Sequence, residues 1–110
     1  MEQNITDIDF AKGDSIVPVI VQDANTKEVL TLAYSNKESL ERTLTTGNSW
    51  FWSRSRKKLW MKGEESGNTQ KIRKVLVDCD SDALIYLVEP AGPACHTGER
   101  TCFHNSLEVK

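Results

Sequence analysis

The chain has 110 residues, of which 38% are hydrophobic and 27% are charged, and its formal net charge is −2. This length fits one compact domain, and the slight acidity excludes a general attraction to nucleic acid or to acidic membranes. The N-terminus lacks the basic region and apolar stretch of a secretory signal, and no apolar run is long enough to span a bilayer. We therefore expect a single intracellular domain over residues 1–110.

The first third of the chain predicts a β-hairpin. Residues 1–13 are polar and are expected to form a short, partly ordered lead-in. Residues 15–22 are rich in β-branched side chains and predict a strand, in which Pro18 indicates a sheet edge or a bulge. Turn-forming residues follow at 23–27, and residues 28–34 alternate as the return strand.

A helix is predicted after the hairpin, reaching to about Thr46. Ser35 and Glu38 have the spacing of a capping box, with Ser35 as the N-cap. Gly47 stands where a glycine commonly ends a helix.

The second half of the chain predicts mainly strands. We expect them at residues 50–53, 59–62, 72–78 and 83–89. The residues from Pro90 onward are rich in Gly, Pro, Cys and His and are typical of a functional loop. Strands outnumber helices, so the predicted class is α+β, with a mainly antiparallel β-sheet and one principal helix.

Residues 78–82 read Asp-Cys-Asp-Ser-Asp. Strand alternation would place Asp78, Asp80 and Asp82 on one face, where like charges repel one another unless a cation binds them. Oxygen ligands favour a hard ion such as Mg²⁺ or Ca²⁺. Cys79 would point the other way, and a thiolate suits a softer ion such as Zn²⁺. This segment therefore predicts parts of two different metal sites.

The three cysteines, Cys79, Cys95 and Cys102, cannot all pair in disulfides. As three thiolates they would hold zinc with one position open for water or substrate, the arrangement of a catalytic site. The alternative is three unrelated buried thiols. His96 is the candidate general base, unless it only bonds the backbone of its loop, and His104 could instead complete a closed four-ligand site.

Residues 50–60 interleave aromatic side chains with arginines and lysines. Arginine forms bidentate contacts with phosphate, and aromatic rings stack on bases. Residues 63–68 add small residues whose backbone N–H groups can cradle phosphate. These features favour a site for a small phosphorylated ligand. The alternative is a solvated basic hairpin with its tryptophans in the core.

Four motifs, in this order, resemble the phosphoribosyl-AMP cyclohydrolase family. They are W-S-R-S-R at 52–56, W-M-K-G-E-E-S-G-N at 60–68, D-C-D-S-D at 78–82, and G-P-A-C-H-T-G at 92–98 with C-F following at 102–103. The resemblance implies hydrolysis of the N1–C6 bond in the purine of N1-(5-phosphoribosyl)-AMP, a step of histidine biosynthesis. Many members carry a fused pyrophosphohydrolase domain, which we do not expect in this chain.

The resemblance also implies an intertwined, cytoplasmic homodimer with active sites at the subunit interface. Zinc would bind Cys79 of one subunit with Cys95 and Cys102 of the other, and Mg²⁺ would bind the three aspartates. His96 is assigned proton transfer. The candidates for holding the substrate's phosphates and sugars are Arg54, Arg56, Lys62, Ser66, Gly67 and Asn68.

One hypothesis from another class stays open. In it the protein is a non-catalytic binding module, with a structural zinc that has His104 as its fourth ligand. The segment at residues 50–60 would then hold a nucleotide or RNA.

Overall fold

The computed structural model describes residues 4–110 and confirms the α+β class. Every strand and the helix predicted from the sequence are present. In chain order the elements are η1 (Ile5–Asp7), η2 (Phe10–Gly13), β1 (Val17–Asp23), β2 (Val29–Ser35), α1 (Lys37–Thr46), β3 (Trp50–Ser53), β4 (Lys58–Met61), β5 (Gln70–Val77) and β6 (Leu84–Pro90). The η elements are short 3₁₀ turns, so the lead-in is more structured than expected over the residues described; its residues 1–3 lie outside them.

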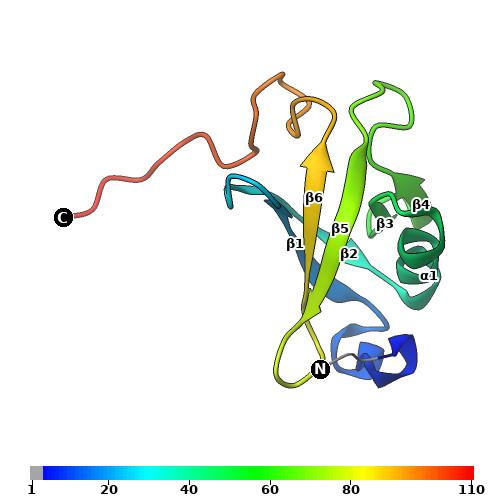
Figure 1. Cartoon of the computed structure of the whole chain (residues 1–110). Helices are drawn as coiled ribbons and strands as arrows, with labels where there is room; N and C mark the ends of the chain where they lie inside the picture. Colours follow the sequence, from blue (N-terminus) through cyan, green and yellow to red (C-terminus); the bar gives the residue numbers. More distant parts are fainter. Residues whose placement is uncertain (1–3) are drawn as a thin grey trace.

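The main sheet has four strands in the order β2-β1-β6-β5 (Figure 1). The pairs β1/β2 and β5/β6 are antiparallel, whereas the central pair β1/β6 is parallel. β3 and β4 form a separate antiparallel hairpin. This hairpin and α1 lie together against one side of the main sheet (Figure 1).

The core lies between these two layers. Alternate residues of β1 and of β6 are buried, at most 4% exposed, which is the period-2 pattern of strands with one covered face. Phe51 from β3 stacks on Tyr86 from β6, with 5.7 Å between the ring centroids, and its ring lies 5.0 Å from that of Trp60. These aromatic contacts fix the β3–β4 hairpin against the sheet.

Pro18 lies in an interior strand, which corrects the expectation of a sheet edge or a bulge at this position. β1 is flanked by β2 and β6, and its bulge falls at Val21/Gln22. Proline is tolerated because the ladder to β6 begins only at Val19, so Pro18 pairs with β2 alone.

The cap of α1 falls one residue later than expected. Asn36 is the N-cap: its side chain accepts from the N–H of Ser39, and the Ser39 hydroxyl accepts from the N–H of Asn36. Ser35 and Glu38 therefore do not form the capping box, because Ser35 still belongs to β2 and is fully buried. Gly47 ends the helix with φ of 76°, as expected.

After β6 the chain folds back over the end of the β1–β2 hairpin and then leaves the domain (Figure 1). We refer to residues 91–103 as the cysteine loop because they carry Cys95 and Cys102. Residues 104–110 are exposed and have no regular structure.

Candidate active site

The cysteine loop is closed by its own backbone hydrogen bonds. The N–H of Ala94 donates to the carbonyl of Arg100 at 3.1 Å, and the N–H of Cys95 donates to that of Glu99 at 3.1 Å. The N–H of Cys102 donates to the carbonyl of Leu30 in β2 at 2.8 Å, which attaches the loop to the sheet. Cys95 is 8% exposed, whereas Cys102 is exposed.

The thiol of Cys95 is set to ionise. The hydroxyl of Thr97 donates to its sulfur at 3.1 Å. This bond and the one from the Thr97 backbone lower the pKa of Cys95 to about 6, against the opposing effect of burial, and His104 and Cys102 lower it further. Cys95 is therefore largely a thiolate at neutral pH, the form that binds metals. The same contacts place Cys102 and His104 beside it.

Cys79 does not join this pair within one chain. It is exposed in the turn between β5 and β6, whereas Cys95 follows the other end of β6 (Figure 1). Within residues 4–110, one group of three or more His, Cys, Asp or Glu side chains comes close enough together to hold a metal, and it is the aspartate triad. A single chain thus brings together two of its three thiols.

Asp78, Asp80 and Asp82 form that triad, with ligand oxygens all within 4.8 Å of one another. They do so in a turn and not on a strand face, which corrects the expected local structure. The carboxylate of Asp78 accepts from the N–H groups of Asp82 and Ala83, at 2.9 and 3.2 Å, and so shapes the turn. The turn gathers all three carboxylates without strand alternation.

A lysine that sequence reasoning missed lies against this triad. The Nζ atom of Lys12 is 3.3 Å from Asp80 and 3.5 Å from Asp82. The pKa of Asp80 is lowered by hydrogen bonds with Asp82 first and Lys12 next, whereas the crowding of Asp82 by Asp80 and Asp78 raises the pKa of Asp82. Lys12 lies in the polar lead-in, 68 positions before Asp80, and no local pattern signals the contact.

A cavity of about 510 Å³ lies between the β3–β4 hairpin, the 63–69 loop and the cysteine loop. Its lining includes Arg56, Lys62, Ser66 and His96, four of the predicted site residues. Lys62 also donates from Nζ to the carbonyl of Ala94 at 2.5 Å, so it connects the cavity to the residue before Cys95. This cavity offers two cations and an imidazole, together with the carboxylates of Glu64 and Glu65.

The other three predicted substrate-binding residues do not line this cavity. The guanidinium of Arg54 lies over the ring of Tyr34, 3.9 Å from its centroid. Asn68 faces Gly92 of the cysteine loop, where a Cβ atom would come within 2.3 Å of the Asn68 side-chain oxygen. Gly67 has φ of 82° and supports the turn of the 63–69 loop.

A second cavity of about 510 Å³ lies between η1, α1 and β5. It is lined mainly by aliphatic side chains and contains none of the predicted site residues. We therefore place the candidate site at the first cavity, the one beside the cysteine loop.

A cavity lined by charged and polar side chains, close to a cysteine of lowered pKa, has the features expected of an enzyme active site. The family model described as phosphoribosyl-AMP cyclohydrolase matches residues 31–104. The chain is 77% identical over 107 residues to the phosphoribosyl-AMP cyclohydrolase of Cenarchaeum symbiosum (strain A), covering 97% of this chain and 99% of the relative.

A second phosphoribosyl-AMP cyclohydrolase, from Nitrosopumilus maritimus (strain SCM1), is 75% identical over 108 residues, with 98% and 100% covered. The histidine biosynthesis bifunctional protein HisIE of Bacillus subtilis (strain 168) is 64% identical over 90 residues, which are 82% of this chain and 43% of that protein. The chain therefore belongs to the phosphoribosyl-AMP cyclohydrolase family, and it is a hydrolase of histidine biosynthesis.

Among the helices of the described residues, none has the length and apolar character needed to cross a membrane.

Proposed function

We propose that the chain hydrolyses the N1–C6 bond in the purine ring of N1-(5-phosphoribosyl)-AMP in the cytoplasm. Water adds at C6, the bond to N1 breaks, and N1 takes up a proton, which gives phosphoribosyl-formimino-aminoimidazole carboxamide ribotide. The observation that carries this proposal is the cavity that holds Arg56, Lys62 and His96 together beside the cysteine loop, in a member of this family.

Zinc fits the donor set of the cysteine loop. Cys95 and Cys102 lie together, and Cys95 is ionised by its contacts with Thr97. Three thiolates would complete a site with one open position, where zinc would supply Lewis acidity to a water molecule. A site of net negative charge weakens that effect, so a neighbouring base is needed.

His96 is our candidate for that base. It lines the cavity one residue after Cys95, and its exposed imidazole can take a proton from water and pass it to the leaving nitrogen. Arg56, Lys62 and Ser66 would bind the phosphates and sugars from the same cavity. Arg54, Gly67 and Asn68 would act at its rim, through the Tyr34 contact and the shape of the 63–69 loop.

The aspartate triad fits Mg²⁺, because three carboxylates offer hard oxygen ligands within 4.8 Å of one another. Lys12 provides a positive charge at the same position. Mg²⁺ would have to displace this ammonium group from Asp80 and Asp82.

A homodimer would resolve the separation of Cys79 from the other two thiols, since Cys79 of one subunit could reach the cysteine loop of the other. A second feature supports a partner. A row of apolar side chains crosses the sheet in register on the face away from the core, formed by Leu32, Ile20, Ile85 and Leu76. Ile20 and Leu32 are 39% and 48% exposed, and a second subunit would cover them.

Mixed dimers test the shared site. We expect Cys79→Ser and Cys95→Ser proteins to be inactive separately, because every site in either dimer lacks one thiol. Co-refolding them in equal amounts should restore about a quarter of the wild-type activity, since half of the dimers would be mixed and each would hold one intact site. Absence of any recovery, with mixed dimers demonstrated by mass spectrometry, would exclude thiols shared between subunits.

The activity itself is tested by following ring opening of phosphoribosyl-AMP by ultraviolet absorbance, with Zn²⁺ and Mg²⁺ supplied. We expect turnover that a chelator removes and added metal restores. His104 lies beside Cys95, so a closed structural site is the rival arrangement. A folded, zinc-loaded protein without turnover would favour that rival and the binding-module hypothesis.

A further inference from the structure

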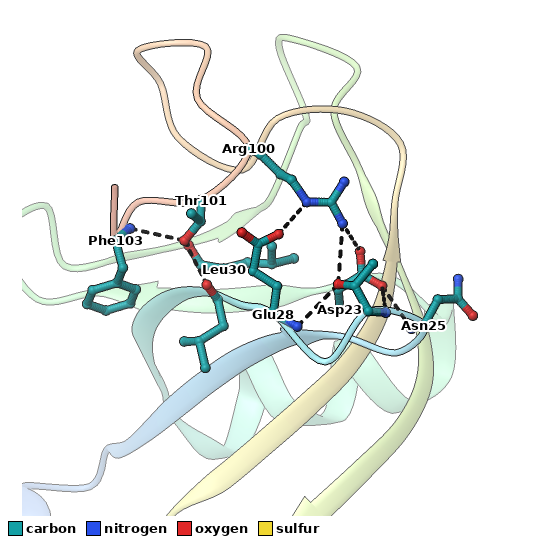
Figure 2. A network of polar contacts seen from close by, with 9 residues as sticks. Asp23, Asn25, Glu28, Leu30, Arg100, Thr101 and Phe103 are labelled. Atoms are coloured by element: carbon teal, nitrogen blue, oxygen red, sulfur yellow. Dashed lines mark hydrogen bonds and ion pairs between the residues drawn. The ribbon is translucent and has the colours of Figure 1, made fainter. Parts of the chain in front are cut away.

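Arg100 stands between Cys95 and Cys102 and connects the cysteine loop to the β1–β2 hairpin. Its Nη2 atom lies 2.9 Å from the carboxylate of Asp23 at the end of β1, and its Nε atom donates to Glu28 in the turn before β2. Figure 2 shows the guanidinium reaching across from the loop to both carboxylates. The contact between Arg100 and Asp23 spans 77 positions in the sequence.

Asp23 is a fixed anchor for this contact. Its side chain is 5% exposed, and its second carboxylate oxygen accepts from the N–H groups of Asn25 and Thr26 at 2.8 and 3.1 Å. The carboxylate therefore cannot turn away from Arg100 without losing these bonds. A buried carboxylate also needs a positive partner, so each of the two side chains holds the other in place.

The backbone of Arg100 contacts the part of the cysteine loop that carries Cys95. Its carbonyl accepts from the N–H of Ala94, which precedes Cys95, while Thr101 donates from its hydroxyl to the carbonyl of Val29 at 2.7 Å. One residue thus binds the hairpin with its side chain and the Cys95 side of the loop with its backbone. The two thiols are held relative to each other through this residue.

We propose that Arg100 is a positioning residue: its contacts with Asp23 and Glu28 hold Cys95 and Cys102 in the arrangement in which both thiolates bind one metal ion. This inference rests on the proposed zinc site. Arg100 does not bind the ion or the substrate in this proposal, and it acts only through the loop. Groups that orient metal ligands typically change metal affinity by about 10- to 100-fold when they are removed.

The test is a titration of the metal-free dimer with Co²⁺, followed by the charge-transfer absorption of cobalt thiolates. We expect Arg100→Ala to weaken Co²⁺ binding by at least about tenfold. Arg73→Ala is the matched control, because Arg73 is equally exposed, at 55%, and also pairs with a glutamate, Glu89. This control should bind Co²⁺ as the wild type does.

Amide hydrogen exchange of the metal-free proteins gives a second readout. In Arg100→Ala the N–H groups of Ala94, Cys95 and Cys102 should exchange faster than in the wild type and in Arg73→Ala. Arg100→Lys keeps the positive charge but loses the planar guanidinium, which can donate to two carboxylates at once. We therefore expect its Co²⁺ affinity and its amide exchange rates to lie between those of Arg100→Ala and the wild type. If Arg100→Ala does not fold, Glu28→Gln removes one half of the anchor at an exposed position and should give an intermediate loss of affinity.

The outcomes separate this inference from the proposed function. A folded Arg100→Ala protein that is less stable to urea but binds Co²⁺ with wild-type affinity would overturn the positioning role alone. If Arg100→Ala does not fold and Glu28→Gln is used in its place, wild-type Co²⁺ affinity of Glu28→Gln would also overturn the positioning role. A wild-type protein without cobalt–thiolate absorption would overturn the zinc site, and this inference with it.

Discussion

The contact between Gly92 and Asn68 joins the cysteine loop to the 63–69 loop, and it can be tested by adding one methyl group. Gly92 has no positive φ, so Gly92→Ala introduces no backbone strain and tests packing alone. The new Cβ atom would lie 2.3 Å from the side-chain oxygen of Asn68 and 2.9 Å from its Cγ atom.

The size of the effect follows from these distances. Ordinary contact begins at 3.4 Å, so the amide of Asn68 must move by about 1.1 Å, the difference between 3.4 and 2.3 Å. Inserting a methyl group into a packed position costs about 1–3 kcal/mol, and we expect the lower end because the obstructing group is the end of a side chain. The midpoint of urea unfolding should fall with an unchanged m-value.

The double variant Gly92→Ala/Asn68→Ala supplies the control. Truncating Asn68 makes room for the methyl group. Adding Gly92→Ala to the Asn68→Ala variant should therefore lower its stability much less than Gly92→Ala lowers the stability of the wild type. KM for the substrate should rise in Gly92→Ala, because the displaced 63–69 loop carries Ser66 on the cavity wall. Equal losses from the methyl group in both backgrounds would refute the contact.

Two further predictions concern charged groups. Lys12→Met should tighten Mg²⁺ binding by up to about fivefold, because the ammonium no longer competes for the triad, and calorimetry showing unchanged affinity would contradict this. For Asp23, burial raises the pKa, but the N–H groups of Thr26 and Asn25 and the charge of Arg100 outweigh it and lower the pKa overall. The ionised carboxylate of Asp23 therefore stabilises the fold above the pKa that this group has in the unfolded chain. This stabilisation is lost as the pH falls through the lower pKa that the group has in the folded chain. Wild type should lose more stability than Asp23→Asn below about pH 4, and parallel urea midpoints over that range would argue against it.

The strands could be predicted because short runs of β-branched and apolar residues are bounded by turn-forming residues. In β1 and β6 the residues at 17, 19 and 21 and at 84, 86 and 88 face the core, but the sequence does not show this, because Ile20, Ile85 and Leu87 on the other face are apolar as well. The cap of α1 was displaced by one residue because Ser35, Asn36 and Ser39 all suit capping. Burial of Ser35 in β2 decides among them, and burial is a property of the tertiary structure.

The sequence pointed to the candidate residues that lie in short motifs, and it missed the contacts between residues far apart in the chain. Arg56, Lys62, Ser66 and His96 come from motif segments and meet at one cavity. Lys12 contacts the triad, and Arg100 contacts Asp23. In both cases the partners are far apart in the chain, and no local sequence motif indicates that they meet. Only the folded chain brings their charges together.

The sequence suggested a three-thiol site, but the positions of the cysteines along β6 show that a single chain cannot complete it. Cys79 precedes β6 and Cys95 follows it, and a seven-residue strand spans roughly 23 Å at about 3.3 Å per residue. A rigid, doubly paired strand cannot bend to close that distance. If the three thiols share one metal ion, as proposed, the chain must associate with another copy, and the outer sheet face around Ile20 and Leu32 would be a surface for that association. Within one chain, β6 keeps Cys79 apart from Cys95.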